Sequence, residues 1–124
     1  MVRRKSFTLS RESVDEAIFD MTMLDYGFHL FTDIDTGKDS VVYRQNGEFR
    51  LAQLSPDPEH VLPTAAPLTV SPHPAPTLTL PEAIERLELT QLPFMFFSDQ
   101  ATGRGNVIYH RYDGHYGLIT PAET

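Results

Sequence analysis

The sequence predicts an α+β protein made of two tandem β-α-β-β-β repeats, whose antiparallel sheets pack against each other as an intramolecular pseudo-dimer. Three observations lead to this prediction. The chain repeats itself, each copy begins with a capped amphipathic helix, and the first strand after each helix is apolar on both faces. With 124 residues and a hydrophobic fraction of 40%, the chain can bury a core, but each copy alone is small.

The duplication becomes visible when the sequence is shifted against itself by 66 positions. This shift aligns residues 16–18 with residues 82–84, and the Thr-Gly pair at 36–37 with the Thr-Gly pair at 102–103. One extra residue near Tyr112 then moves the offset to 67. An internal repeat of this length indicates that one supersecondary unit has been written twice.

A proline-rich connector separates the two copies, because seven of the ten prolines lie between Pro56 and Pro76. Proline fixes φ and removes a backbone donor, so this stretch favours an extended, semi-rigid link over a helix. Its apolar segment at residues 68–70 is a candidate edge strand. The predicted boundaries are 1–56 for the first repeat, 57–76 for the connector and 77–124 for the second repeat.

Each repeat opens with a predicted helix. Ser13 followed by Glu16 forms a capping box, and Thr79 followed by Glu82 forms a second one. The acidic residues on the opposite helix faces are interpreted as solvent-exposed. Apolar residues recur at helical spacing at Val14, Ala17, Ile18, Met21 and Leu24 in the first copy, and at Leu80, Ala83, Ile84 and Leu87 in the second.

Three strands follow each predicted helix. Thr-Gly, Asn-Gly and Asp-Gly pairs lie where hairpin turns require a positive φ. The segment at residues 6–9 is a further strand candidate. The predicted strands cover residues 28–33, 40–44 and 49–52 in the first copy, and 94–99, 106–111 and 116–119 in the second.

The segments FHLFT and FMFFS are apolar on both faces, although a half-exposed strand would alternate with polar residues. One helix covers only one face, so the other copy is the expected cover for the second face. Alternation places Phe28 with Leu30 on one face, and Phe94 with Phe96 on the matching face. We expect these four residues to form the interface between the repeats.

The formal net charge of −7 argues against general nucleic-acid binding, which depends on clustered cations, so we expect no DNA partner and weak, salt-sensitive binding of free RNA. The dense basic run is Arg3-Arg4-Lys5. It is interpreted either as a solvated strand edge or as a local contact to phosphates. No apolar run is long enough for a membrane helix, so we expect no membrane partner.

No motif for catalysis or for cofactor binding is recognisable. The chain has no Cys, which removes thiol nucleophiles and thiolate metal sites. The acidic segment at residues 33–39 lacks the spacing of a calcium loop and is predicted to be a turn. His110 and His115, with Asp113 nearby, make an incomplete zinc site, and His29 is interpreted as a packed or edge residue. We therefore predict no catalytic, cofactor-binding or metal-binding residue.

The segment VRRKSFTLSRESVDEAIFDMTMLDYGFHLFTDIDTGKDSVVYRQNGEFRL resembles the C-terminal domain of long-form ribosome hibernation-promoting factors, the sigma-54 modulation or S30EA family. The basic strand, the helix start, the aromatic strand, Thr-Gly and VVYR carry this resemblance. The segment PEAIERLELTQLPFMFFSDQATGRGNVIYHRYDGHYGLITP resembles a second instance. A tandem pair of this kind is similar to the hypoxia- and dormancy-associated hibernation factors.

The resemblance implies a non-enzymatic module that helps to hold ribosomes in a translationally silent state, with a small-subunit protein or rRNA as partner. It also implies a cytoplasmic location, consistent with the lack of Cys. The alternative hypothesis is a small-molecule or metal-sensing domain, and an enzyme ranks third. The family's N-terminal ribosome-binding domain is absent from this sequence, so we expect either an excised piece or a protein that lost that domain.

In single-copy relatives the resemblance implies homodimers that can link two ribosomes. Here a tether of about 20 residues holds the second copy at an effective concentration near millimolar. The two copies also differ, for example at Asp20 and Arg86, which disfavours a symmetric pairing between chains. We therefore expect a monomer that acts on single ribosomes.

Overall fold

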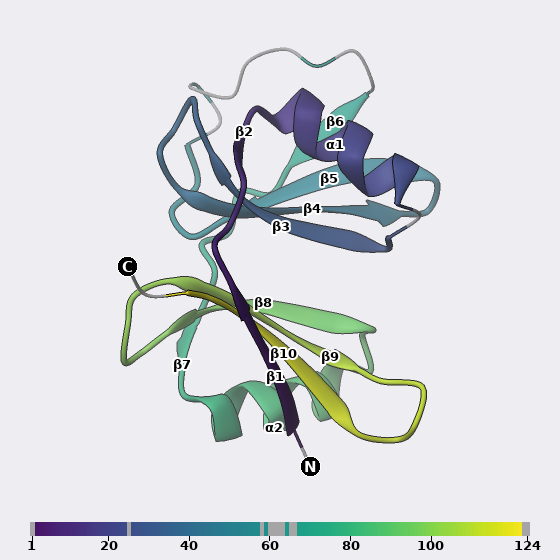
Figure 1. Ribbon diagram of the computed structural model, residues 1–124, viewed down its shortest axis with the longest axis vertical. Helices are drawn as coiled ribbons and strands as arrows, with labels where there is room; N and C mark the ends of the chain where they lie inside the picture. Colours follow the sequence, from purple (N-terminus) through teal and green to yellow (C-terminus); the bar gives the residue numbers. More distant parts are fainter. Residues whose placement is uncertain (1, 25, 58, 60–63, 65–66, 123–124) are drawn as a thin grey trace. The chain divides into compact units, whose positions relative to one another are not determined.

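The computed structural model describes residues 2–24, 26–57, 59, 64 and 67–122. Residues 58, 60–63, 65 and 66 of the predicted connector lie outside the described residues. The α+β class and the tandem organisation are confirmed, with two helices and two five-stranded sheets in the described part of the chain (Figure 1). None of the helices described is long and apolar enough to cross a membrane.

The chain divides into two compact units. Unit 1 comprises Met1–Thr8 and Pro76–Thr124, and unit 2 comprises Leu9–Ala75. The elements of unit 1 are β1 (Val2–Phe7), β7 (Thr77–Leu78), α2 (Leu80–Thr90), β8 (Phe94–Asp99), β9 (Gly105–His110) and β10 (Tyr116–Pro121). The elements of unit 2 are β2 (Arg11–Glu12), α1 (Val14–Met23), β3 (Phe28–Asp33), β4 (Asp39–Gln45), β5 (Glu48–Gln53) and β6 (Leu68–Val70).

The first strand of each repeat lies in the sheet of the other repeat. Strand β1 runs parallel to β10, with Val2 opposite Tyr116, and β6 runs parallel to β5, with Leu68 opposite Phe49. At the offsets of the duplication, Leu68 corresponds to Val2, and Tyr116 corresponds to Phe49. The two pairings are therefore the same contact made reciprocally, and the candidate edge strand of the connector is the second copy of β1.

This exchange makes the compact units different from the predicted repeats. The first eight residues of the predicted first repeat belong to unit 1, and the described end of the connector, up to residue 75, belongs to unit 2. The physical reason is that β5 and β10 each have an edge that needs a partner strand. The boundaries 1–56, 57–76 and 77–124 stay a prediction about the sequence repeats.

The predicted antiparallel strands form the centre of each sheet, and parallel outer strands make both sheets mixed. Their strand orders are β2-β3-β4-β5-β6 and β7-β8-β9-β10-β1. The three central strands of each sheet are antiparallel, as hairpins require, whereas the two outer strands are parallel to their neighbours. The sequence does not predict β2 and β7, because a strand of two residues is too short to show an alternation of polar and apolar residues.

Each helix packs on one face of its own sheet (Figure 1). Both predicted capping boxes are present, at Ser13 with Glu16 and at Thr79 with Glu82. The helical spacing predicts Leu24 on the apolar face, but Leu24 caps α1 at its C-terminus and is exposed. The buried core of unit 2 comprises Val14, Ala17, Ile18, Met21, Phe31, Val42 and Leu51, and that of unit 1 comprises Leu78, Ala83, Leu87, Phe97, Ile108 and Leu118.

Candidate functional site

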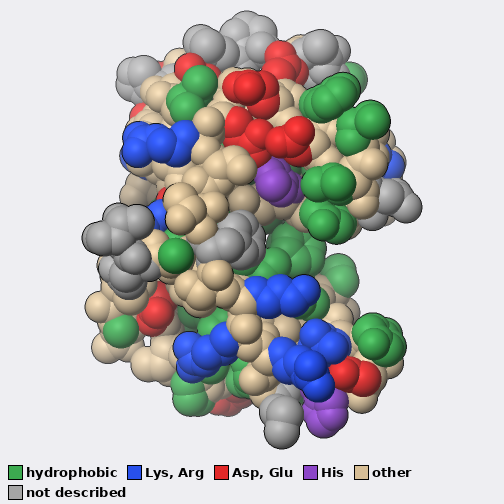
Figure 2. Space-filling view, in the orientation of Figure 1, with side chains coloured by type: hydrophobic (Ala, Val, Ile, Leu, Met, Phe, Trp, Pro, Cys, Tyr) green, Lys and Arg blue, Asp and Glu red, His purple; other side chains and the backbone are tan. Residues whose placement is uncertain are grey.

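The basic run lies on β1, the edge strand of the sheet in unit 1. Val2 packs against the core beneath α2, so strand alternation directs Arg4 to the same face, where it lines a cavity with Thr79 and Asp99. Arg3 and Lys5 point to the opposite face. All three cations are exposed, and Figure 2 shows Lys and Arg side chains gathered over this part of unit 1. The structure therefore presents the basic run on two faces of one edge strand.

Charge is distributed unevenly between the two units. Unit 1 contains six Lys and Arg residues against six Asp and Glu residues, whereas unit 2 contains four against eleven. The whole formal charge of −7 therefore lies in unit 2. Acidic side chains gather over α1, with a His beside them (Figure 2). A contact with phosphates at Arg3, Arg4 and Lys5 stays a prediction, but the neutral unit is the better place for it.

The four predicted interface residues lie on the sheet faces that turn away from the helices. In β3, Phe31 belongs to the core under α1, so Phe28 lies on the other face with its neighbour Leu30. In β8, Phe97 belongs to the core under α2, which places Phe94 and Phe96 on the corresponding face. The structure thus brings each pair together on one face. That the two faces meet stays a prediction.

The acidic segment after β3 forms a turn, as predicted. The buried carboxylate of Asp33 accepts hydrogen bonds from the Asp35 amide at 3.0 Å and from the Thr36 hydroxyl at 3.1 Å. Gly37 then adopts a positive φ of 73°. Asp99 accepts from the backbone of the matching turn in the second repeat. Each of these two carboxylates therefore stabilises its own turn by accepting hydrogen bonds from it.

The hairpin histidines do not gather around Asp113. The Asp113 carboxylate accepts hydrogen bonds from Arg111 Nε and from the backbone amide of His115. The His110 ring packs against Tyr116, with 5.5 Å between ring centroids. The Asp113 carboxylate and the His110 ring therefore both contact residues of their own hairpin.

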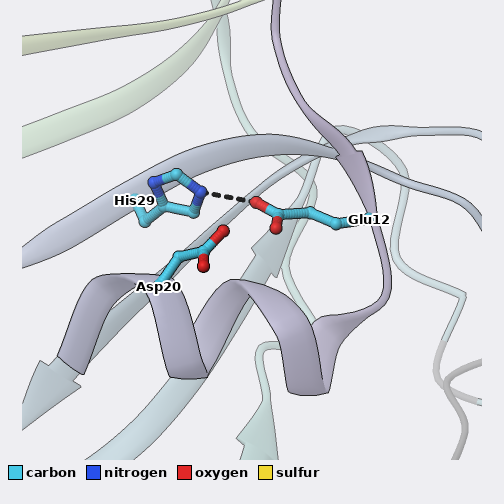
Figure 3. Close-up of side chains that lie close together, drawn as sticks. All are labelled: Glu12, Asp20 and His29. Atoms are coloured by element: carbon cyan, nitrogen blue, oxygen red, sulfur yellow. Dashed lines mark hydrogen bonds and ion pairs between the residues drawn. The ribbon is translucent and has the colours of Figure 1, made fainter. Parts of the chain in front are cut away.

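A polar cluster that the sequence did not predict lies in unit 2. Glu12 comes from β2, Asp20 from α1 and His29 from β3, and Figure 3 shows Asp20 pointing from the helix toward the other two side chains. The Nε2 atom of His29 lies 2.6 Å from Oε1 of Glu12. One ligand atom from each of the three residues lies within 4.8 Å of the other two. Within the described residues, this is the one such group of three metal-ligating side chains.

Local structure brings these three side chains together. Strand β2 runs parallel to β3, and the amide of Ile34, the residue after β3, donates a hydrogen bond to the Glu12 carbonyl at 3.1 Å. Glu12 directly precedes Ser13, the N-cap of α1, so the chain turns from strand to helix beside it. His29 shares the helix-side face of β3 with Phe31, and their rings are nearly parallel.

Burial dominates the electrostatics of the cluster. The Glu12 side chain is 7% exposed, and the His29 side chain is 17% exposed. Burial raises the pKa of the Glu12 carboxyl above its ordinary value, and a side-chain hydrogen bond with Asp20 raises it further. The hydrogen bond with His29 lowers that pKa and opposes the other two effects. Two carboxyl groups this close disfavour each other's ionised form, and a shared proton or cation relieves this effect.

Comparison with known proteins assigns the family. Residues 1–51 and 69–118 match the family described as Sigma 54 modulation/S30EA ribosomal protein C terminus. The chain belongs to this family. The match falls in two segments, as the duplication requires, and the second segment begins within β6, the strand that repeats β1. The resemblance inferred from the sequence is therefore confirmed.

Relatives of this S30EA-type chain have names that refer to translation or to the ribosome. The chain is 44% identical over 133 residues to a protein of Mycobacterium tuberculosis named dormancy associated translation inhibitor, with 98% of this chain and 47% of that protein covered. It is 41% identical over 54 residues to the ribosome hibernation promotion factor of Bacillus subtilis, covering 43% of this chain and 29% of the relative. A chloroplastic ribosome-binding factor of Spinacia oleracea, PSRP1, is 44% identical over 48 residues, covering 39% and 16%. The chain spans about half the length of its Mycobacterium tuberculosis relative.

One signal for the polar cluster was present in the S30EA repeats themselves. At the offset of 66, Glu12, Asp20 and His29 align with Leu78, Arg86 and Met95. The first copy thus has two carboxylates and an imidazole at positions where the second copy has none. The expectation that His29 is a packed or edge residue describes its burial but misses its two partners.

Proposed function

We propose that this chain is a non-catalytic, ribosome-associated module of a hibernation factor, which helps to hold ribosomes in a translationally silent state in the cytoplasm. Membership of the S30EA C-terminal family supports this proposal, as do relatives named for ribosome binding, hibernation and translation inhibition. The family and these names indicate a role in binding.

The reciprocal strand exchange is the observation on which the rest of the proposal depends. Because β1 pairs with β10 and β6 pairs with β5, both sheets are completed by strands of the same chain. A second chain is therefore not needed as the partner of β5 or of β10. We therefore propose that the chain is a monomer, and that the protein silences single ribosomes without joining two of them.

The proposed contact on the ribosome is the basic edge strand. Arg3, Arg4 and Lys5 are exposed on a unit with no net charge, so they can approach phosphate oxygens or an acidic protein surface without strong repulsion. Unit 2 carries the negative charge and is expected to face away from rRNA. The partner is proposed to be rRNA or a protein of the small subunit.

Co-sedimentation of the purified chain with ribosomes tests the proposal. We expect the chain to pellet with ribosomes, with single ribosomes as the only ribosomal peak on a sucrose gradient. Replacing Arg3, Arg4 and Lys5 with Ala should weaken binding and flatten its salt dependence. The control removes three cations elsewhere, with Arg11, Arg44 and Arg86 replaced by Ala. Equal losses in both variants, or paired ribosomes, would contradict the proposal.

A further inference from the structure

We propose that Glu12, Asp20 and His29 form a binding site for one divalent transition-metal ion, with Zn²⁺ as the preferred ion. The inference is independent of the ribosomal role, because it concerns a different surface and is tested by metal binding. It adds a ligand site to unit 2 where the sequence predicted none.

The geometry comes close to what a metal ion needs. The three donor atoms come from a strand, a helix and a second strand, and they already lie within 4.8 Å of one another. Ligand atoms around a tetrahedral zinc ion lie roughly 3.3 Å apart, given metal–ligand distances of about 2.0–2.1 Å. The 2.6 Å contact between His29 Nε2 and Glu12 Oε1 must therefore open slightly. In the metal-bound state, the ion would replace the proton of the hydrogen bond between these two atoms.

The donor set selects the class of metal. One imidazole nitrogen and two carboxylate oxygens suit Zn²⁺ and its neighbours in the first transition row. Three protein ligands leave a fourth position for water, and the partial exposure of His29 gives access to it. Mg²⁺ and Ca²⁺ require six or more oxygen ligands and are poorly served by this set.

The second repeat shows that the fold does not need this cluster. Leu78, Arg86 and Met95 occupy the matched positions in unit 1, and Leu78 is part of the buried core there. A buried carboxyl beside a second carboxyl is unfavourable unless something compensates for it. The hydrogen bond with His29 compensates in part, and a bound cation would complete the compensation, because it is shared by both carboxylates and by the imidazole.

Metal binding would fasten β2 to α1 and β3. Glu12 lies three residues after Leu9, where the chain enters unit 2 from the exchanged strand. The amides of Thr32 and Ile34 donate to the carbonyls of Ser10 and Glu12, at 2.9 and 3.1 Å. These hydrogen bonds form only while β2 is paired with β3, so a bound ion should slow the exchange of the two amide protons.

Binding of Zn²⁺ to the full chain is the first test, with stoichiometry from equilibrium dialysis and ligand geometry from the absorption spectrum of Co²⁺. We expect one ion per chain, and at least a tenfold loss of affinity in His29→Met and in Glu12→Leu, which carry the residues of the second repeat. Asp20→Asn is the mildest change, because its side chain is half-buried and keeps its size, and it should also weaken binding. A variant with His110→Ala and His115→Ala is the matched control and should bind like the unaltered chain. Absence of binding in the unaltered chain, unchanged binding in Asp20→Asn, or loss of binding in the control would overturn the proposal.

Hydrogen exchange gives a second readout with an internal control. The amides of Ser98 and Gln100 match Thr32 and Ile34 in the other repeat, and they donate to Pro76 and Leu78 at 2.8 and 3.0 Å. Zn²⁺ should slow exchange at Thr32 and Ile34 at least threefold and leave the two matched amides unchanged. Equal slowing in both units, or slowing in neither, would contradict a site at Glu12, Asp20 and His29.

Discussion

The two units share the same backbone arrangement but differ in the side chains at one corner of the sheet. Strand β2 pairs with β3 in the register that β7 uses with β8, and both short strands lead into a capped helix. In unit 2 this corner holds Glu12, Asp20 and His29, whereas in unit 1 Leu78 joins the core. The comparison teaches that the corner is stable with an apolar residue, so the polar cluster of unit 2 is not a requirement of the fold.

A second pair of matched positions shows how the copies diverge without changing the sheet. Arg44 lies opposite Phe49, with its guanidinium 5.3 Å from the ring centroid. In the other unit, His110 lies opposite Tyr116, and these two rings also pack together. A cation–π contact and a ring–ring contact thus occupy the same cross-strand site. The sheets keep their register, while their exposed surfaces become different.

The largest expected effect tests whether the two cores are equivalent. Phe31 and Phe97 occupy matched positions and are 0% and 2% exposed. Phe31→Ala and Phe97→Ala should each lower the free energy of unfolding by about 3–5 kcal/mol, because each leaves a cavity under its helix. Chemical denaturation measures both losses. A loss below about 1 kcal/mol in one variant would show that one core dominates the stability.

A smaller effect is expected at Gly117, where the copies differ. A Cβ atom at Gly117 would collide with the ring of Tyr109, whereas the matched position in unit 2 is Arg50. Gly117→Ala should therefore cost about 1–3 kcal/mol, because the ring must move. The same substitution in a Tyr109→Ala background is the control and should cost much less. An equal cost in both backgrounds would mean that the ring is not the obstacle.

The smallest effect concerns the capping box of α2. The backbone amide of Thr79 donates to Glu82, and this hydrogen bond lowers the pKa of the Glu82 carboxyl. A carboxyl with a lowered folded-state pKa stabilises the fold at neutral pH, and this contribution is lost as the pH falls through the carboxylate range. Glu82→Ala should lower the thermal midpoint at neutral pH and have less effect in acid. Glu85→Ala, on the exposed face of the same helix, is the control and should lower the thermal midpoint at neutral pH by less than Glu82→Ala does.

Local features of the fold could be predicted from the sequence, whereas the pairing of distant segments could not. The helices follow from Ser13 with Glu16 and from Thr79 with Glu82, because a capping box acts within four residues. Strand β3 follows from its own apolar residues. Strand β1 joins β10 near the other end of the sequence, and β6 joins β5 across the connector; neither strand indicates in its own sequence which edge it joins.

The candidate sites show the same division. The basic run and the faces of Phe28 and Phe94 are visible in the sequence because they depend on neighbours or on strand alternation. The metal-site candidate depends on β2, a strand of two residues whose pairing brings Glu12 to His29, 17 residues further along the chain. No periodic pattern marks such a meeting. Only the mismatch between the repeats pointed to these positions.

The central claim is that one chain completes both of its own sheets. Multi-angle light scattering after gel filtration, with the chain loaded at tens of micromolar, tests it directly, because strand exchange within one chain gives a monomer and exchange between chains gives a dimer. The account predicts a mass of 14.0 kDa that does not change on dilution. A stable species of twice that mass, still present at low micromolar concentration, would contradict it.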